Sequence, residues 1–158
     1  MSIVVEVKGD VTIAGTKVQI GPMVIPGVGA AVLYTTGDAF GTKFDFAVPK
    51  QGVIQGIRFY DVDDEGANME LWIFRDDFTQ TADNAAFALS DADLHLVECN
   101  ILIDTFRDAA NNQVGVEDNL GIDFVAAKAR LWGQWVTRGG PTIAVGAVPS
   151  FVLTIRSD

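Results

Sequence analysis

Apolar and polar side chains alternate along most of this 158-residue chain. In residues 43–48, Phe44, Phe46 and Val48 share one face, while Lys43 and Asp45 lie on the other. Alternate side chains of a β-strand point to opposite faces, so a period of two predicts half-buried strands. The same pattern predicts further strands at 53–60, 94–104, 130–137 and 150–156.

The run from Met69 to Phe74 differs because it is apolar on both faces apart from Glu70. Such a run predicts a central strand, or a strand whose outer face is covered by another subunit. Helix is scarce, and its best candidate lies within 83–94, where Ser90 and Asp93 resemble a capping box. Short strands separated by turn residues predict a single all-β domain, a β-sandwich or a jelly-roll-like fold.

The first thirty residues have a different character. Residues 3–7 and 11–20 could form a hairpin, but 21–30 carry two prolines and several glycines, which indicates an extended linker. We therefore expect an N-terminal arm, residues 1–30, and a β-sandwich body, residues 31–158. The alternative, that the arm forms two more strands of the same sheet, stays open.

Composition and charge restrict the partners. The chain is 49% hydrophobic and 20% charged, which is typical of an ordered core. Its 21 acidic and 11 basic residues give a net charge of −10, which opposes approach to nucleic acid and to anionic membranes. The N-terminus lacks the pattern of a secretory signal, and no window approaches the ~20 apolar residues of a membrane span. We expect a soluble protein that is made in the cytoplasm.

An acidic segment, Asp61–Gly66, has the opening spacing of a calcium-binding loop. Position twelve of that loop is Trp72, where a bidentate glutamate is needed, so an acidic turn between two strands is the better interpretation. Other possible oxygen donors are interpreted as solvated turn residues and helix caps: Asp76, Asp77, Asp91 and Asp93.

His95 and Cys99, the single histidine and the single cysteine, suggest a base and a nucleophile. On one strand they would share a face but lie about 13 Å apart at ~3.3 Å per residue, beyond hydrogen-bond reach. Cys99 is therefore expected to be a small buried hydrophobic residue, and it cannot form an intrachain disulfide. The segment Gly27–Gly29 lacks the third glycine of a dinucleotide loop and predicts a turn.

Three tryptophans, Trp72, Trp132 and Trp135, could form a platform for sugar stacking, but core or subunit contacts are the favoured interpretation. Trp132 and Trp135 are three residues apart and point to opposite faces of a regular strand. We expect no catalytic residue, no cofactor-binding residue and no metal ligand. Carboxylate-only chemistry stays open, because acidic side chains can meet in space from anywhere in the chain.

Residues 31–158 resemble a family of small virion proteins encoded in the structural-gene blocks of tailed bacteriophages. Six stretches carry the resemblance: TTGDAFG (35–41), GVIQGIRFYDVDDEG (52–66), MELWIFRDDF (69–78), DNAAFALSDADL (83–94), LWGQWVTRGGPT (131–142) and FVLTIRSD (151–158). Residues 1–30 lie outside it.

The resemblance implies a head decoration, or cement, protein that is located on the virion and binds the outside of the capsid shell. The implied partners are the major capsid protein and further copies of the chain, as a homo-oligomer. An acidic subunit suits an outer surface better than a DNA-facing one. Two alternatives stay open: a tail- or baseplate-associated module that binds host glycan, and a carboxylate-based glycan hydrolase.

Overall fold

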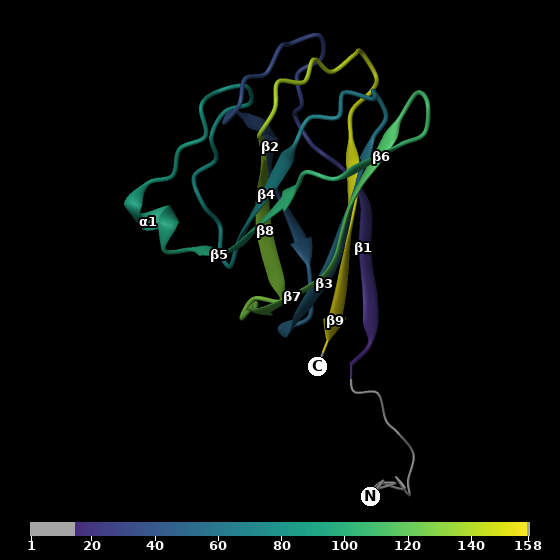
Figure 1. The fold of residues 1–158 in the computed structure, drawn as a ribbon. Coiled ribbons are helices and arrows are strands. Elements are labelled where there is room, and N and C mark those ends of the chain that lie inside the picture. The colour runs from purple at the N-terminus through teal and green to yellow at the C-terminus, as the bar shows by residue number, and fades with distance from the viewer. Residues whose placement is uncertain (1–14, 158) are drawn as a thin grey trace, which may run out of the picture.

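The computed structural model describes residues 15–157 and shows two antiparallel sheets packed face to face (Figure 1). The five-stranded sheet has the order β1 (Lys17–Val24), β9 (Ser150–Ser157), β3 (Gln51–Asp61), β7 (Gln113–Val125) and β6 (Phe106–Asp108). The four-stranded sheet has the order β2 (Ala39–Ala47), β8 (Arg130–Thr137), β4 (Met69–Phe74) and β5 (Val97–Ile103). The predicted all-β sandwich is confirmed.

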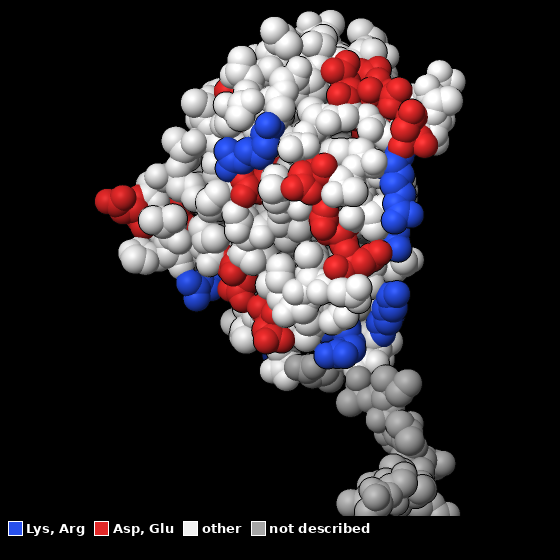
Figure 2. Space-filling model, in the orientation of Figure 1, with Lys and Arg blue, Asp and Glu red and all other residues white. Residues whose placement is uncertain are grey.

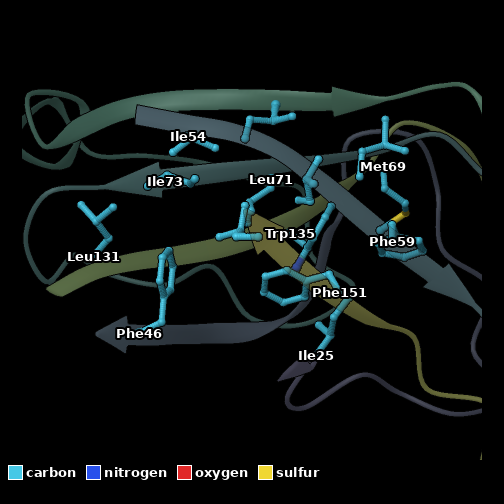
Figure 3. Close-up of a cluster of buried hydrophobic side chains, with 14 of the residues drawn as sticks. Ile25, Phe46, Ile54, Phe59, Met69, Leu71, Ile73, Leu131, Trp135 and Phe151 are labelled. Atoms are coloured by element: carbon cyan, nitrogen blue, oxygen red, sulfur yellow. The ribbon is translucent and has the colours of Figure 1, made fainter. Parts of the chain in front are cut away.

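The core lies between the sheets and receives the inward-facing side chains of both (Figure 3). Trp135 of β8 is fully buried at its centre. Its ring packs edge-on against Phe59 and Phe151, with ring centroids 5.0 and 5.2 Å away. Edge-to-face aromatic pairs of this kind contribute about 0.5–1.5 kcal/mol beyond the area that they bury. The core therefore joins the two sheets through one aromatic cluster.

The predicted strands coincide with β2, β3, β4, β5, β8 and β9, with ends displaced by a few residues. The helix prediction is also confirmed. Helix α1 (Asp91–Leu94) begins after Ser90, whose Oγ accepts a hydrogen bond from the Asp93 N–H at 3.1 Å. The chain adopts strand conformation again only at Val97, so the start predicted for the following strand is too early. Strands β6 and β7 were not predicted.

Residues 17–30 belong to the sandwich. Strand β1 pairs with β9, with an irregularity between Ile20 and Met23, and the Ile25 side chain is buried in the core. The linker prediction is therefore wrong at Gly21–Val24, and the additional-strand alternative holds for residues 17–24. An edge strand tolerates a proline because only one of its sides is hydrogen-bonded to the sheet. The predicted hairpin strand at 3–7 lies outside the described residues.

The outer face of the four-stranded sheet is covered by residues 75–96, which we call the covering segment; it contains α1 (Figure 1). The Phe78 ring stacks on Phe74 of β4, with centroids 3.8 Å apart, and Phe87 packs on Trp72 at 5.4 Å. Strand β4 is central, as one of the two predictions for it required. Its outer face is covered by the chain itself.

Gln134 of β8 fastens the covering segment to the sheet. The side chain is fully buried although it points away from the core. Its Oε1 accepts a hydrogen bond from the Thr81 N–H at 3.1 Å, and its Nε2 donates to the carbonyl oxygens of Thr81 at 2.6 Å and Gly41 at 3.1 Å. Buried amide groups are costly unless they are hydrogen-bonded, so this arrangement fixes the position of the segment.

Candidate binding face on the five-stranded sheet

Two hollows open on the outer face of the five-stranded sheet. The first, of about 630 Å³, lies over β3, β6 and β7, and the second, of about 380 Å³, lies over β1, β3 and β9. Both are lined by Arg58 and Asp118, so they adjoin each other at this pair, and we call the two hollows together the sheet groove. Its other lining residues include Lys17, Gln55, Tyr60, Arg107, Val114, Val116, Asn119, Thr154 and Arg156.

Strand register explains how these side chains reach one face. Along β3, Ile57 and Phe59 point into the core, so Arg58 and Tyr60 point outward. Arg58 lies between Val116 of β7 and Val152 of β9 in the ladder. The groove is thus an outward-facing mixture of cationic, aromatic and aliphatic side chains.

Four cations line the groove: Lys17, Arg58, Arg107 and Arg156. Arg58 lies 3.9 Å from Asp118, whereas the other three have no carboxylate within 4.0 Å among residues 15–157. This is notable in a chain with almost twice as many acidic as basic residues.

Lys17 and Arg156 face each other directly across the β1–β9 ladder. Like charges in that position destabilise a sheet by a few tenths of a kcal/mol or more, because their side chains are close. Figure 2 shows a column of basic side chains along the right-hand edge of the molecule, with acidic side chains above and beside it, and further basic side chains elsewhere on this view. The groove therefore offers positive charge that the described part of the chain does not neutralise.

The acidic turn, residues 61–66, follows the end of β3 beside the groove. Asp61 is buried and accepts hydrogen bonds from the N–H groups of Asp63 and Gly66 and from Gln113 Nε2, each at 3.1 Å. These bonds occupy the carboxylate that would begin a calcium loop. Within residues 15–157, no group of three or more acidic, His or Cys side chains could hold a metal ion.

The acidic turn also supports the loop formed by residues 138–149. Asp63 accepts a hydrogen bond from the Ala144 N–H at 2.5 Å, and Glu65 accepts one from the Thr142 N–H at 3.2 Å. Because both carboxylates are held by backbone donors, the acidic turn is fixed against this loop.

The other acidic candidates lie on the opposite side of the sandwich. Asp76 pairs with Lys128 at 2.7 Å, and the hydrogen bond from that lysine lowers the pKa of Asp76. Asp77 pairs with Lys43. Asp93 is hydrogen-bonded by the Ser90 hydroxyl, which lowers the pKa of Asp93. Asp76 and Asp77 therefore form surface ion pairs, where solvated turn residues were predicted, and Asp93 belongs to the predicted cap of α1.

His95 and Cys99 lie on different elements. His95 caps the C-terminal end of α1, whereas Cys99 lies on β5 and packs against the core. Burial, together with the neighbouring Glu98, raises the pKa of the Cys99 thiol to about 12. The thiol is therefore protonated at neutral pH, which is the state of a structural cysteine and not of a nucleophile.

The tryptophans do not form a common platform. Trp135 is in the core and Trp72 packs under Phe87, while Trp132 is half-buried on the outer face with the Lys128 ammonium 5.9 Å from its ring centroid. Trp132 and Trp135 do point to opposite faces, as their spacing predicted.

The segment Gly27–Gly29 forms a turn, as predicted. The N–H of Gly29 donates to the Asp83 carboxylate at 3.0 Å and to the Tyr34 hydroxyl oxygen at 2.9 Å. The same carboxylate accepts hydrogen bonds from the Tyr34 hydroxyl at 2.9 Å and from the Gly41 N–H at 2.7 Å. These glycine amides therefore hold the covering segment to β2 and do not form an open cradle for phosphate.

No family model, no curated protein and no solved structure matches this chain. Among the helices within residues 15–157, none is long and apolar enough to cross a membrane. Inferences about function therefore depend on the chain's own residues and on the resemblance described above.

Sequence reasoning missed the groove cations. The alternation along β3 does place Arg58 and Tyr60 on one face. Nothing local predicts that Lys17 and Arg156 lie near them, because their pairing joins strands separated by more than one hundred residues.

Proposed function

We propose that this chain is a tailed-bacteriophage capsid decoration protein that binds the outer surface of the head shell and stabilises it. The observation that carries the proposal is the difference between the two outer faces of the sandwich. One face is covered by the chain's own residues 75–96, and the other is an open groove of cationic, aromatic and aliphatic side chains. Tyrosine and arginine at an open sheet face are typical of protein contact surfaces.

Two further properties support the proposal. The net charge of −10 suits a protein that stands outside a DNA-filled shell, because it opposes contact with nucleic acid. A protein that binds only the assembled shell stabilises that shell by mass action, so no catalytic group is required. In this function the sheet groove contacts another protein subunit of the virion, while the covering segment on the opposite side of the sandwich faces solvent.

The proposal is tested by measuring the copy number of the protein in purified particles, relative to the major coat protein, by quantitative mass spectrometry. A copy number comparable with that of the coat protein is expected. A few copies per particle would instead support a tail location, and absence from particles would refute a structural function. Particles that lack the protein should also release DNA at a lower temperature than complete particles.

A further inference from the structure

We propose that the sheet groove binds an acidic, extended segment of a different virion protein, whose carboxylates pair with the groove cations. This inference rests on the proposed use of the open face as a contact surface for another protein subunit. It adds the charge and shape of the segment that lies there, and the side chains that recognise it.

The groove cations form a line that crosses the sheet diagonally, with one cation on each of four strands. Lys17 of β1 and Arg156 of β9 are opposite each other in the ladder. Arg58 of β3 lies four residues further along the sheet, as counted on β9. Arg107 of β6 is another two residues further, in the row of Tyr60. The line therefore advances along the strands as it passes from β1 to β6.

This line is about as long as an extended peptide of eight residues. Its ends are separated by about six residues along the strands and four strand spacings across them, which correspond to about 20 Å and 19 Å. Lys17 and Arg107 are therefore roughly 28 Å apart. An extended chain covers that distance with about eight residues, and alternate side chains of such a chain face the same way. About four side chains of a bound segment would thus face the groove.

Outside the groove, almost every cation is held by an acceptor of the chain itself. Within residues 15–157 the exception is Lys50. The others are paired with carboxylates or, for the last of them, with the carbonyl oxygen of His95: Lys43, Lys128, Arg130, Arg138 and Arg75. In the groove only Arg58 has a carboxylate within 4.0 Å. Positive charge without an acceptor is thus concentrated on one face, which is complementary to an acidic partner.

Two carboxylates on the same face argue against a uniformly charged polyanion as the occupant. Asp118 lies 3.9 Å from Arg58, and Asp123 is opposite Val53 in the row of Arg156. A nucleic acid or a sulfated glycan laid across the face would meet these carboxylates as well as the cations. A protein segment avoids this repulsion, because it can carry carboxylates opposite the cations and neutral side chains opposite Asp118 and Asp123.

The uncharged lining of the groove also favours a protein segment. Val114 and Val116 of β7 lie among the cations, and Tyr60 is the single aromatic side chain among the described lining residues. One tyrosine is not a platform on which successive sugar rings can stack. A peptide offers apolar side chains to the valines and carboxylates to the cations, whereas a glycan offers only the second.

The first test is carbodiimide cross-linking of purified particles that contain the wild-type protein. This reagent joins a lysine amine to a carboxylate that it contacts, and Lys17 is the one lysine that lines the described groove. Mass spectrometry should find Lys17 joined to an aspartate or glutamate of another virion protein, in a segment with at least three acidic residues in eight. Lys17→Arg should remove this cross-link while particles retain the protein. As an internal control, Lys128 should be joined to Asp76 of its own chain.

The second test adds purified chain to particles that lack it. Lys17→Glu and Arg107→Glu reverse the charge at the two ends of the line, and each should weaken binding by at least about fivefold. The matched control Lys50→Glu makes the same change in net charge, from −10 to −12, outside the groove, and it should bind like the wild type. An increase in salt from about 0.1 to 1 M shortens the screening length from about 10 to 3 Å and should weaken wild-type binding more than that of either groove variant.

Lys17→Glu also separates binding from folding. It places opposite charges across the β1–β9 ladder in place of two like charges, so its Tm should equal or exceed that of the wild type. Weaker binding by a variant with an undiminished Tm then reflects the lost contact with the partner.

Cross-links of Lys17 that reach only its own chain or another copy would overturn the inference, as would groove variants that bind like the control. Binding of dextran sulfate that both groove variants lose, without a cross-link from Lys17 to another protein, would overturn it in favour of a glycan. These results leave the proposed function intact if particles carry coat-like numbers of the protein. A few copies per particle, cross-linked to an acidic segment of a tail protein, would refute the proposed function and sustain the inference. Absence from particles would refute both.

Discussion

Replacement of Gln134 by leucine should separate the covering segment from the four-stranded sheet. Leucine fills a similar volume but removes all three hydrogen bonds that Gln134 makes to Thr81 and Gly41. Each bond contributes about 0.5–1.5 kcal/mol net, and a buried backbone group left without a partner costs about 1–3 kcal/mol. The free energy of unfolding should therefore fall by about 4 kcal/mol.

Urea denaturation followed by circular dichroism measures this change. For a domain of this size, Tm should fall by about 8–16 °C. The variant should also bind a dye that reports exposed apolar surface, because Phe74 and Trp72 lose their cover. The control Gln51→Leu, at an exposed position at the start of β3, should change stability by no more than about 0.5 kcal/mol. A loss below about 1 kcal/mol for Gln134→Leu would show that the segment is held by its aromatic contacts alone.

Three further predictions concern other parts of the molecule. Because the pKa of Cys99 is about 12, its reaction with a disulfide reagent at pH 8 should be roughly 1000-fold slower than that of a free thiol, and unfolding in urea should abolish the difference. The hydrogen bond from Ser90 lowers the pKa of Asp93. The ionised Asp93 carboxylate should therefore stabilise the fold above the ordinary aspartate pKa, and this stabilisation should be lost as the pH falls through the lowered pKa. In Asp93→Asn, the free energy of unfolding should depend less on pH in this acidic range. Deletion of residues 1–30 should lower Tm sharply by removing strand β1 and the buried Ile25 side chain; a Tm equal to that of the full chain would refute the placement of β1 in the sheet.

The longest strand escaped sequence reasoning because its middle has the composition of a turn. Strand β7 contains Glu117-Asp118-Asn119 and Gly121, residues that favour turns. The structure places Asn119 and Gly121 at positive φ, and the β3–β7 register shifts between Ile54 and Gly56. Pairing with β3 on both sides of this irregularity keeps the strand in the sheet. Local propensity was overridden by contacts that only the complete sheet supplies.

The covering segment also depends on contacts between distant parts of the chain, which local sequence does not predict. Alternation correctly placed Trp132 and Trp135 on opposite faces, and Ser90 correctly predicted the start of α1. Periodicity cannot tell whether an outward side chain meets water or another part of the chain. Gln134 was therefore indistinguishable from a solvated residue, although it is fully buried. The fold class followed from the sequence, whereas the distinction between the covered and the open face required the structure.

The position of β9 has a consequence for biosynthesis. This strand follows all the others in the chain, yet it lies between β1 and β3 in the five-stranded sheet. A ribosome that has made residues 1–149 has therefore produced both neighbours of a strand that does not yet exist. Until β9 emerges, β1 has no partner strand in this sheet and one side of β3 is unpaired, and unpaired strands of this kind promote aggregation. Completion of the sheet therefore has to wait until β9 has been made, and it is expected to proceed at the slow rates of folds built from distant strand pairs.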